Sequence, residues 1–276
     1  MSAGGLVALE QVGRWPAVAV AGAGRGGETP ATVGDVRRPF AWASLTKVLV
    51  ALSVLVAVEE ETVALDEPAG PPGSTVRHLL AHASGLAPDG DRVLAPPGTR
   101  RIYSNGGFEL LGGELARRAG MAVGEYVAQA VLVPLGMVGT SLPVGASPAS
   151  GASGPLADLL RLGQELLRPT LVAPTTIEEA TTVAFPGLAG VVPGFGRHDP
   201  CDWGLGLELR DAKSPHWTGS RNSAVTFGHF GRAGGFLWVD PVADVVCGSL
   251  SDRPFGQWAA EVWPRLSDDV LAELSA

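Results

Sequence analysis

Apolar residues fill one continuous stretch near the N-terminus and recur with helical spacing further along the chain. Residues 39–58 contain a single charged side chain, Lys47, and three glutamates follow directly. A segment that is apolar on all sides predicts a buried helix, which we place at residues 44–61. Elsewhere the spacing of apolar residues predicts shorter helices. They cover residues 75–82, 106–119, 124–132, 156–167 and 258–274.

Short apolar segments bounded by glycine and proline predict strands at both ends of the chain. They cover residues 17–21, 29–36, 224–229, 235–239 and 244–249. This arrangement indicates an α/β (α+β) fold in which a mainly helical region is inserted between the strands of one sheet. We expect a single domain over residues 1–276. Its α/β part comprises residues 1–62 and 218–276, and its helical part comprises residues 63–217.

Composition and charge narrow the classes of partner. Hydrophobic residues make up 46% of the 276, enough for a substantial core, and 17% are charged. The net charge of −8 disfavours nucleic acid and anionic membranes as partners. Cys201 and Cys247 lie far apart, which disfavours a disulfide framework and excludes a cysteine metal site. The N-terminus has no signal-peptide pattern, so we expect a cytoplasmic protein.

Three other patterns suggest functions that their contexts argue against. Residues 40–58 are long enough to cross a bilayer, but Lys47 would then lie near its centre, where a charge is strongly unfavourable. The segment Gly22-Ala-Gly-Arg-Gly-Gly27 matches G-x-G-x-x-G, but no helix opens after it, so we expect a hairpin loop rather than a dinucleotide site. His78 and His82 have the i, i+4 spacing of metal ligands, but the glutamate of H-E-x-x-H is missing, and we expect structural histidines.

Lys47 is one of two lysines in the chain and lies three positions after Ser44. On a helix these two positions share a face, which brings the hydroxyl and the amine together. A lysine in apolar surroundings has a lowered pKa and can take a proton from a neighbouring serine. This is the physical content of the S-x-x-K pattern. The alternative is a lysine whose stem packs on the helix while its ammonium reaches solvent.

Two further segments carry polar residues suited to an active site. In Tyr103-Ser-Asn105, a tyrosine beside a lysine can shuttle protons, because the cation favours phenolate, and Asn105 can hold a substrate amide. The alternative is a buried tyrosine and a turn asparagine. In His229-Phe-Gly231, glycine within strand-like sequence often marks the close approach of a ligand, which His229 can assist. The alternative there is a bulge at a sheet edge.

Together these segments resemble the serine β-lactamase and penicillin-binding-protein superfamily, particularly its class C-like branch of DD-peptidases and β-lactamase-fold esterases. Ser44-Leu-Thr-Lys47 matches S-x-x-K, Tyr103-Ser-Asn105 matches Y-x-N, and His229-Phe-Gly231 matches H-x-G, the counterpart of K-[ST]-G. The order and spacing of the three motifs agree with the family, and the resemblance covers about residues 35–255.

The resemblance implies an antiparallel sheet flanked by helices, and a serine hydrolase without a metal or cofactor. Ser44 would form an acyl-enzyme, with Lys47 and Tyr103 as proton-transfer groups. The N–H groups of Ser44 and of Arg232 would form the oxyanion hole, and a serine that opens its helix would also gain from the helix dipole. The substrate-binding residues that the resemblance implies are Asn105, His229, Gly231 and Arg232.

Two residues depart from the better-known enzymes of the family. His229 replaces the lysine of K-[ST]-G and Phe230 replaces its hydroxyl residue, both of which normally help to bind a substrate carboxylate. We therefore expect an esterase- or peptidase-like hydrolase of small ester or amide substrates, with weak or no turnover of β-lactams. A β-lactamase or D-alanyl carboxypeptidase proper and a non-catalytic binding module are the alternatives. The acyl group and the oligomeric state stay open.

Overall fold

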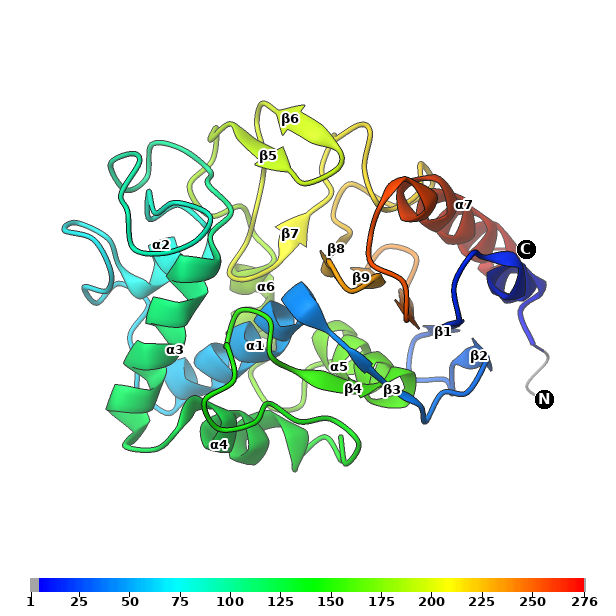
Figure 1. Ribbon diagram of the computed structural model, residues 1–276, viewed down its shortest axis with the longest axis horizontal. Coiled ribbons are helices and arrows are strands. Elements are labelled where there is room, and N and C mark those ends of the chain that lie inside the picture. Colours follow the sequence, from blue (N-terminus) through cyan, green and yellow to red (C-terminus); the bar gives the residue numbers. More distant parts are fainter. Residues whose placement is uncertain (1–4, 276) are drawn as a thin grey trace.

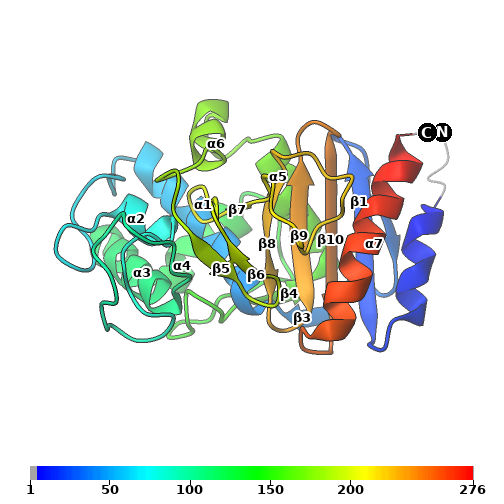
Figure 2. The ribbon, with the colours of Figure 1, turned by 90° about the horizontal axis from the view of Figure 1, so that it is seen from above.

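A six-stranded antiparallel sheet forms the centre of the computed structural model, which describes residues 5–275 (Figures 1 and 2). The two ends of the chain supply five of its strands, which confirms the α/β class and the antiparallel sheet. From one edge to the other the strands are β2 (Ala31–Val33), β1 (Ala19–Arg25), β10 (Val245–Ser251), β9 (Gly235–Asp240), β8 (Phe227–Gly231) and β7 (Glu208–Leu209).

Helices cover both faces of this sheet. On one face α7 (Gln257–Leu274) packs beside the 3₁₀ helix η1 (Val7–Arg14), and on the other α5 (Leu156–Leu167) packs against β9 and β10 (Figure 2). Successive side chains of a strand point to opposite faces. Accordingly, Cys247 of β10 lies in the apolar cluster beside α7, while its neighbour Val246 lies in the larger cluster that contains α5.

The remaining helices lie away from α7 and the chain termini, towards the opposite end of the molecule (Figures 1 and 2). Among them is α1 (Thr46–Glu59), of which all but the last two residues are buried. Its apolar character on all sides therefore reflects a position inside the fold, and within residues 5–275 no helix has the length and apolarity to span a membrane. The other helices are α2 (Val76–Leu80), α3 (Asn105–Ala119), α4 (Val123–Val127), the π-helical turn η3 (Ala128–Leu132) and α6 (Pro174–Ala180).

Two small strand pairs complete the fold: β3 (Pro39–Ala41) with β4 (Ser153–Pro155), and β5 (Gly190–Val192) with β6 (Gly196–His198). The division of the chain into a sheet part and a helical part at 63–217 stays a proposal. Two elements of that middle segment belong with the sheet, because α5 packs on it and β7 forms its edge.

The glycine-rich segment near the N-terminus differs from the expected loop. Strand β1 continues through Gly22 and Gly24, and the turn comes later, at Gly26 and Gly27. A Cβ on Gly22 would lie 2.7 Å from the side chain of Leu160 in α5, and one on Gly24 would lie 2.9 Å from the backbone of Pro30. These glycines therefore allow close packing within a hairpin, rather than forming its turn.

Candidate active site

Ser44 lies where the chain turns from β3 into α1. It occupies the middle of the 3₁₀ turn η2 (Ala43–Leu45), two residues before the first residue of the α-helix that the sequence predicts it to open. The preceding Ala43 has a left-handed backbone, with φ +45°, which is uncommon for a residue with a side chain. The turn leaves Ser44 half-buried at the wall of a cavity.

Gly231, at the end of β8, lies against this turn. A Cβ at Gly231 would come within 2.3 Å of the Trp42 carbonyl oxygen and 3.4 Å of the Ser44 nitrogen. Any larger residue would push β8 away from the serine. The glycine of the His229-Phe-Gly231 motif thus permits close approach of two backbone segments, which is the role that glycine within a strand suggests.

Lys47 is fully buried, and its amine lies among uncharged oxygen atoms. Nζ donates hydrogen bonds to Asn105 Oδ1 at 2.7 Å and to the Ala149 carbonyl at 2.8 Å, and it lies 3.5 Å from Ser44 Oγ. Burial lowers the pKa of Lys47 from 10.5 to about 7, although the negative charges of Glu109 and Asp89 oppose the shift. A large fraction of the amine is therefore neutral at physiological pH, as a base requires.

Tyr103 lies beside the same amine, with Lys47 Nζ 4.8 Å from the centre of its ring. Burial raises the pKa of the Tyr103 phenol well above its ordinary value, and the neighbouring Ser44 hydroxyl offsets this only in part. The expected lowering of this pKa is therefore not found, because desolvation of the phenolate dominates the shift. At neutral pH Tyr103 is a phenol, able to donate a proton.

Asn105 is the first residue of α3 and connects Lys47 to the surface. Its Oδ1 accepts from Lys47, while its Nδ2 donates to Asp89 Oδ1 at 2.9 Å, so the orientation of the amide is fixed by both neighbours. Ser104 caps the helix, since its Oγ accepts from the Gly107 N–H at 2.9 Å. Asp89 could not be predicted from the sequence, because it is an exposed loop residue without a motif around it.

His229 lies within a regular strand rather than a bulge, since all of β8 pairs with β9. Its Nδ1–H donates to the Phe230 carbonyl at 2.6 Å. Burial, with the charge of Lys47 adding to it, lowers the pKa of His229 to about 4. The ring is therefore uncharged at neutral pH and does not replace the cation of K-[ST]-G. The cation of this region is Arg232, which is exposed at the rim of the cavity.

The cavity beside Ser44 has a volume of about 290 Å³ and brings five of the predicted residues together. Gly231 packs behind Ser44, and Lys47 lies beneath Tyr103. The other walls are largely aromatic: Phe230 belongs to the His229-Phe-Gly231 motif, whereas Trp203 and Phe255 lie outside the three motifs. In full, the lining residues are Ser44, Tyr103, Asn105, Pro193, Trp203, Glu208, His229, Phe230, Arg232 and Phe255.

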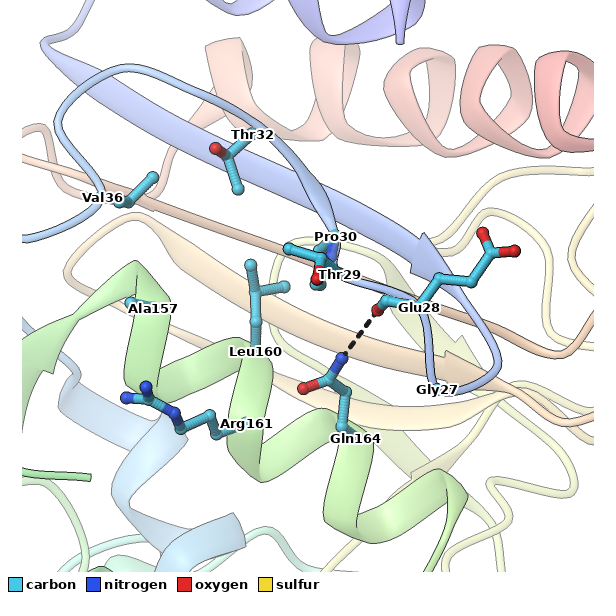
Figure 3. A pocket seen from close by; sticks show the side chains of 10 residues that line it. All are labelled: Gly27, Glu28, Thr29, Pro30, Thr32, Val36, Ala157, Leu160, Arg161 and Gln164. Carbon is cyan, nitrogen blue, oxygen red and sulfur yellow. Dashed lines mark hydrogen bonds between the residues drawn. The ribbon is translucent and has the colours of Figure 1, made fainter. Parts of the chain in front are cut away.

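A second cavity, of about 440 Å³, lies between the β1–β2 hairpin and α5 (Figure 3). Gln164 of α5 crosses its edge and donates to the Glu28 carbonyl at 3.1 Å. The cavity faces the side of α5 rather than a helix N-terminus, so the glycine-rich segment beside it lacks the geometry of a dinucleotide site. None of the predicted site residues lines it.

The two histidines with the spacing of metal ligands, His78 and His82, contact different residues. His78 Nδ1 lies 2.9 Å from Thr75 Oγ1, and its ring packs on Phe185. His82 instead accepts a hydrogen bond from the Ser104 N–H and packs on Tyr103. The structure thus places His82, which the sequence suggests is merely structural, at the edge of the candidate site.

The chain matches a known protein family along nearly its whole length. The β-lactamase family model matches residues 3–272. A β-lactamase from Mycobacterium bovis is 54% identical and superimposes with a TM-score of 0.96, over 98% of this chain and 100% of that one. No curated protein matches the chain significantly.

More distant structures share the fold alone. A mutant simvastatin synthase from Aspergillus terreus is 16% identical, with a TM-score of 0.78 over 97% of this chain and 93% of that one. A hydrolase with promiscuous acyltransferase activity is 18% identical, with a TM-score of 0.78 over 96% of each chain. Because the family model spans nearly the whole sequence and the Mycobacterium bovis protein matches along its full length, this chain belongs to the β-lactamase family, whose members are serine hydrolases.

Proposed function

We propose that the protein hydrolyses small ester or amide substrates through an acyl-enzyme at Ser44. The observation that carries this proposal is the buried Lys47 amine, 3.5 Å from Ser44 Oγ and hydrogen-bonded to uncharged oxygens. A buried amine with a pKa of about 7 can accept the serine proton near neutral pH. A non-catalytic binding module would have no need to keep this amine desolvated beside a hydroxyl.

In the proposed reaction the neutral Lys47 takes the hydroxyl proton while Ser44 Oγ attacks the carbonyl carbon. The oxyanion that forms would accept hydrogen bonds from the N–H groups of Ser44 and Arg232. Collapse breaks the bond to the alcohol or amine, which takes the Tyr103 proton, and Tyr103 regains one from the Lys47 ammonium. Water then attacks the acyl-enzyme with the same base, releasing the carboxylic acid and restoring the Ser44 hydroxyl.

The shape of the cavity supports small, uncharged acyl groups. Trp203, Phe230 and Phe255 give it aromatic walls, and about 290 Å³ suits a short chain or a single ring. A substrate carboxylate would find no charge on His229 and would lie near the carboxylate of Glu208. We infer that neutral short-chain or aryl esters are better substrates than carboxylate-bearing ones.

Hydrolysis of β-lactams is the second candidate, favoured by the name of the Mycobacterium bovis relative. Here Arg232 would have to bind the substrate carboxylate from the rim. We expect slower turnover of a chromogenic cephalosporin than of a p-nitrophenyl ester. In the Arg232→Ala variant, cephalosporin turnover should fall while the ester rate stays unchanged.

The test of the proposal combines labelling with turnover. Incubation with a fluorophosphonate followed by mass spectrometry should place the adduct on Ser44. The Ser44→Ala variant should lose the label and about 10³-fold or more in kcat/KM for p-nitrophenyl butyrate. Ser53→Ala is the matched control, because that serine lies in α1, which follows the Ser44 turn, with its hydroxyl bonded to the Leu49 carbonyl. An unlabelled Ser44, together with unchanged turnover in Ser44→Ala, would refute the proposal.

A further inference from the structure

His82 holds the backbone on both sides of Tyr103. Helix α2 ends at Leu80, and His82 then takes a left-handed backbone, with φ +54°. Its carbonyl accepts from the Ile102 N–H at 2.9 Å, and its Nδ1 accepts from the Ser104 N–H at 3.2 Å. Its ring is 1% exposed and lies 4.6 Å from the Tyr103 ring, centre to centre.

The contacts of His82 fix which nitrogen carries its proton. Because a backbone N–H donates to Nδ1, the neutral ring is protonated on Nε2, which has no hydrogen-bond partner among residues 5–275. Burial keeps the pKa of His82 well below its ordinary value, and the charge of Lys47 adds to this. His229 has the opposite tautomer, since its Nδ1–H donates to a carbonyl.

We propose that His82 is a positioning residue that holds the Tyr103 phenol where it can protonate the leaving group. The proposal rests on the proposed function, which gives Tyr103 that role. Tyr103 lies between Ile102 and Ser104, whose N–H groups both donate hydrogen bonds to His82. The imidazole ring of His82 also packs on one side of the Tyr103 ring. Loss of the imidazole leaves the Ser104 N–H without its acceptor and removes the contact on one face of the Tyr103 ring.

Esters with different leaving groups distinguish this positioning role from a purely structural one. An alkoxide leaves slowly unless it is protonated, whereas p-nitrophenolate leaves without a proton donor. A misplaced Tyr103 should therefore slow alkyl esters and spare p-nitrophenyl esters of the same acid. A purely structural role for His82 would slow both esters equally.

Two substitutions separate the hydrogen bond from the backbone conformation. His82→Gly accepts the left-handed backbone freely and removes the acceptor. It should lose about 10- to 100-fold in kcat on the alkyl ester and less than about 3-fold on the p-nitrophenyl ester. His82→Asn tolerates the same backbone, and its Oδ1 takes the place of Nδ1, so it should stay within about 5-fold of wild type on both. His78→Asn, in α2 just ahead of His82, is the matched control and should change neither rate.

An equal loss on both esters in a folded His82→Gly variant, or no loss on the alkyl ester, would overturn the proposal. If that variant does not fold, the wild-type protein provides the test through ¹⁵N NMR of its histidines. His82 should be protonated on Nε2 and His229 on Nδ1 from pH 6 to 8. A proton on Nδ1 of His82 would exclude the hydrogen bond to Ser104. Absence of a fluorophosphonate label on Ser44 would instead refute the proposed function.

Discussion

The two lysines of the chain are both buried, yet their surroundings are opposite. Lys47 Nζ donates to a side-chain amide and a backbone carbonyl and faces Ser44. Lys213, in the loop after β7, donates to the carbonyls of Asp202 and Leu209, and its Nζ lies 3.6 Å from Glu208 Oε1. One buried amine has uncharged partners, and the other is half of an ion pair.

The difference shows that a buried lysine can become a base or can form half of a structural ion pair, depending on its partners. Burial opposes ionisation of Glu208, but the charge of Lys213 and the hydrogen bonds from His216 and Trp217 outweigh it and lower the pKa of Glu208 to about 2. The Glu208 carboxylate therefore stays ionised, and its contact with Lys213 ties the loop to the sheet edge. Without such a partner, Lys47 has a pKa of about 7 and can give up its proton.

Replacing Lys47 should have the largest effect on activity. Lys47→Met keeps the length of the stem and removes the base, so kcat/KM should fall about 10³-fold or more. The free energy of unfolding should be unchanged or higher, because a desolvated amine is removed. Ester hydrolysis and urea unfolding measure the two quantities. Retained activity in this variant would contradict the role of the amine.

Replacing Lys213 should lower the stability of the protein rather than its activity. Lys213→Met leaves the Glu208 carboxylate buried without its partner, which should cost about 3–5 kcal/mol of unfolding free energy. The folded protein should still be labelled at Ser44, since Lys213 touches none of the proposed catalytic groups. Adding Glu208→Gln should restore part of the stability in urea unfolding. A stable Lys213→Met variant would show that the ion pair is dispensable.

The pH dependence should also distinguish the two lysines. Because the reaction requires neutral Lys47, kcat/KM should fall about tenfold per pH unit below the Lys47 pKa of about 7. The folded pKa lies below the value of 10.5, so the unfolded chain binds the additional proton, and stability should rise from pH 7 towards pH 10.5. The Lys47→Met variant should lose this rise, whereas a rise that persists there would have to come from another group.

Glu208 gives a dependence of the same sign, but in the acid range. Its folded pKa lies below the ordinary 4.5, so its stabilising contribution is present above that value and is lost as the pH falls towards 2. The Glu208→Gln variant should lose less stability than wild type over this range when followed by thermal unfolding.

The sequence predicted the parts of the fold that have a strong local pattern. The leucine spacing of α5 predicted its observed bounds, and the apolar run around Lys47 predicted the buried helix that brings the amine beside Ser44. Residues that only the folded chain brings to the site could not be predicted from the sequence. Glu208 and Phe255 line the cavity from segments without a motif, and η1 is too short for its apolar spacing to be distinctive.

Protonation states were also beyond the sequence. The lysine next to Tyr103 suggested a phenolate, but the sign of that shift depends on how deeply the phenol is desolvated. Likewise, the sequence suggested that His229 assists a substrate, but whether its ring is charged depends on its burial, which the sequence does not give.

The smallest predicted effect tests how charges at the surface set the Lys47 pKa. Glu109, exposed on α3, raises this pKa without touching the amine, and its carboxylate accepts from the Ser147 hydroxyl. Glu109→Gln should therefore move the acid limb of kcat/KM to lower pH by a few tenths of a unit, and added salt should remove most of the difference through screening. Glu114→Gln, on the same helix but paired with Arg117, is the control and should leave the limb in place. A shift to higher pH would mean that the charge environment of the amine is set elsewhere than at Glu109.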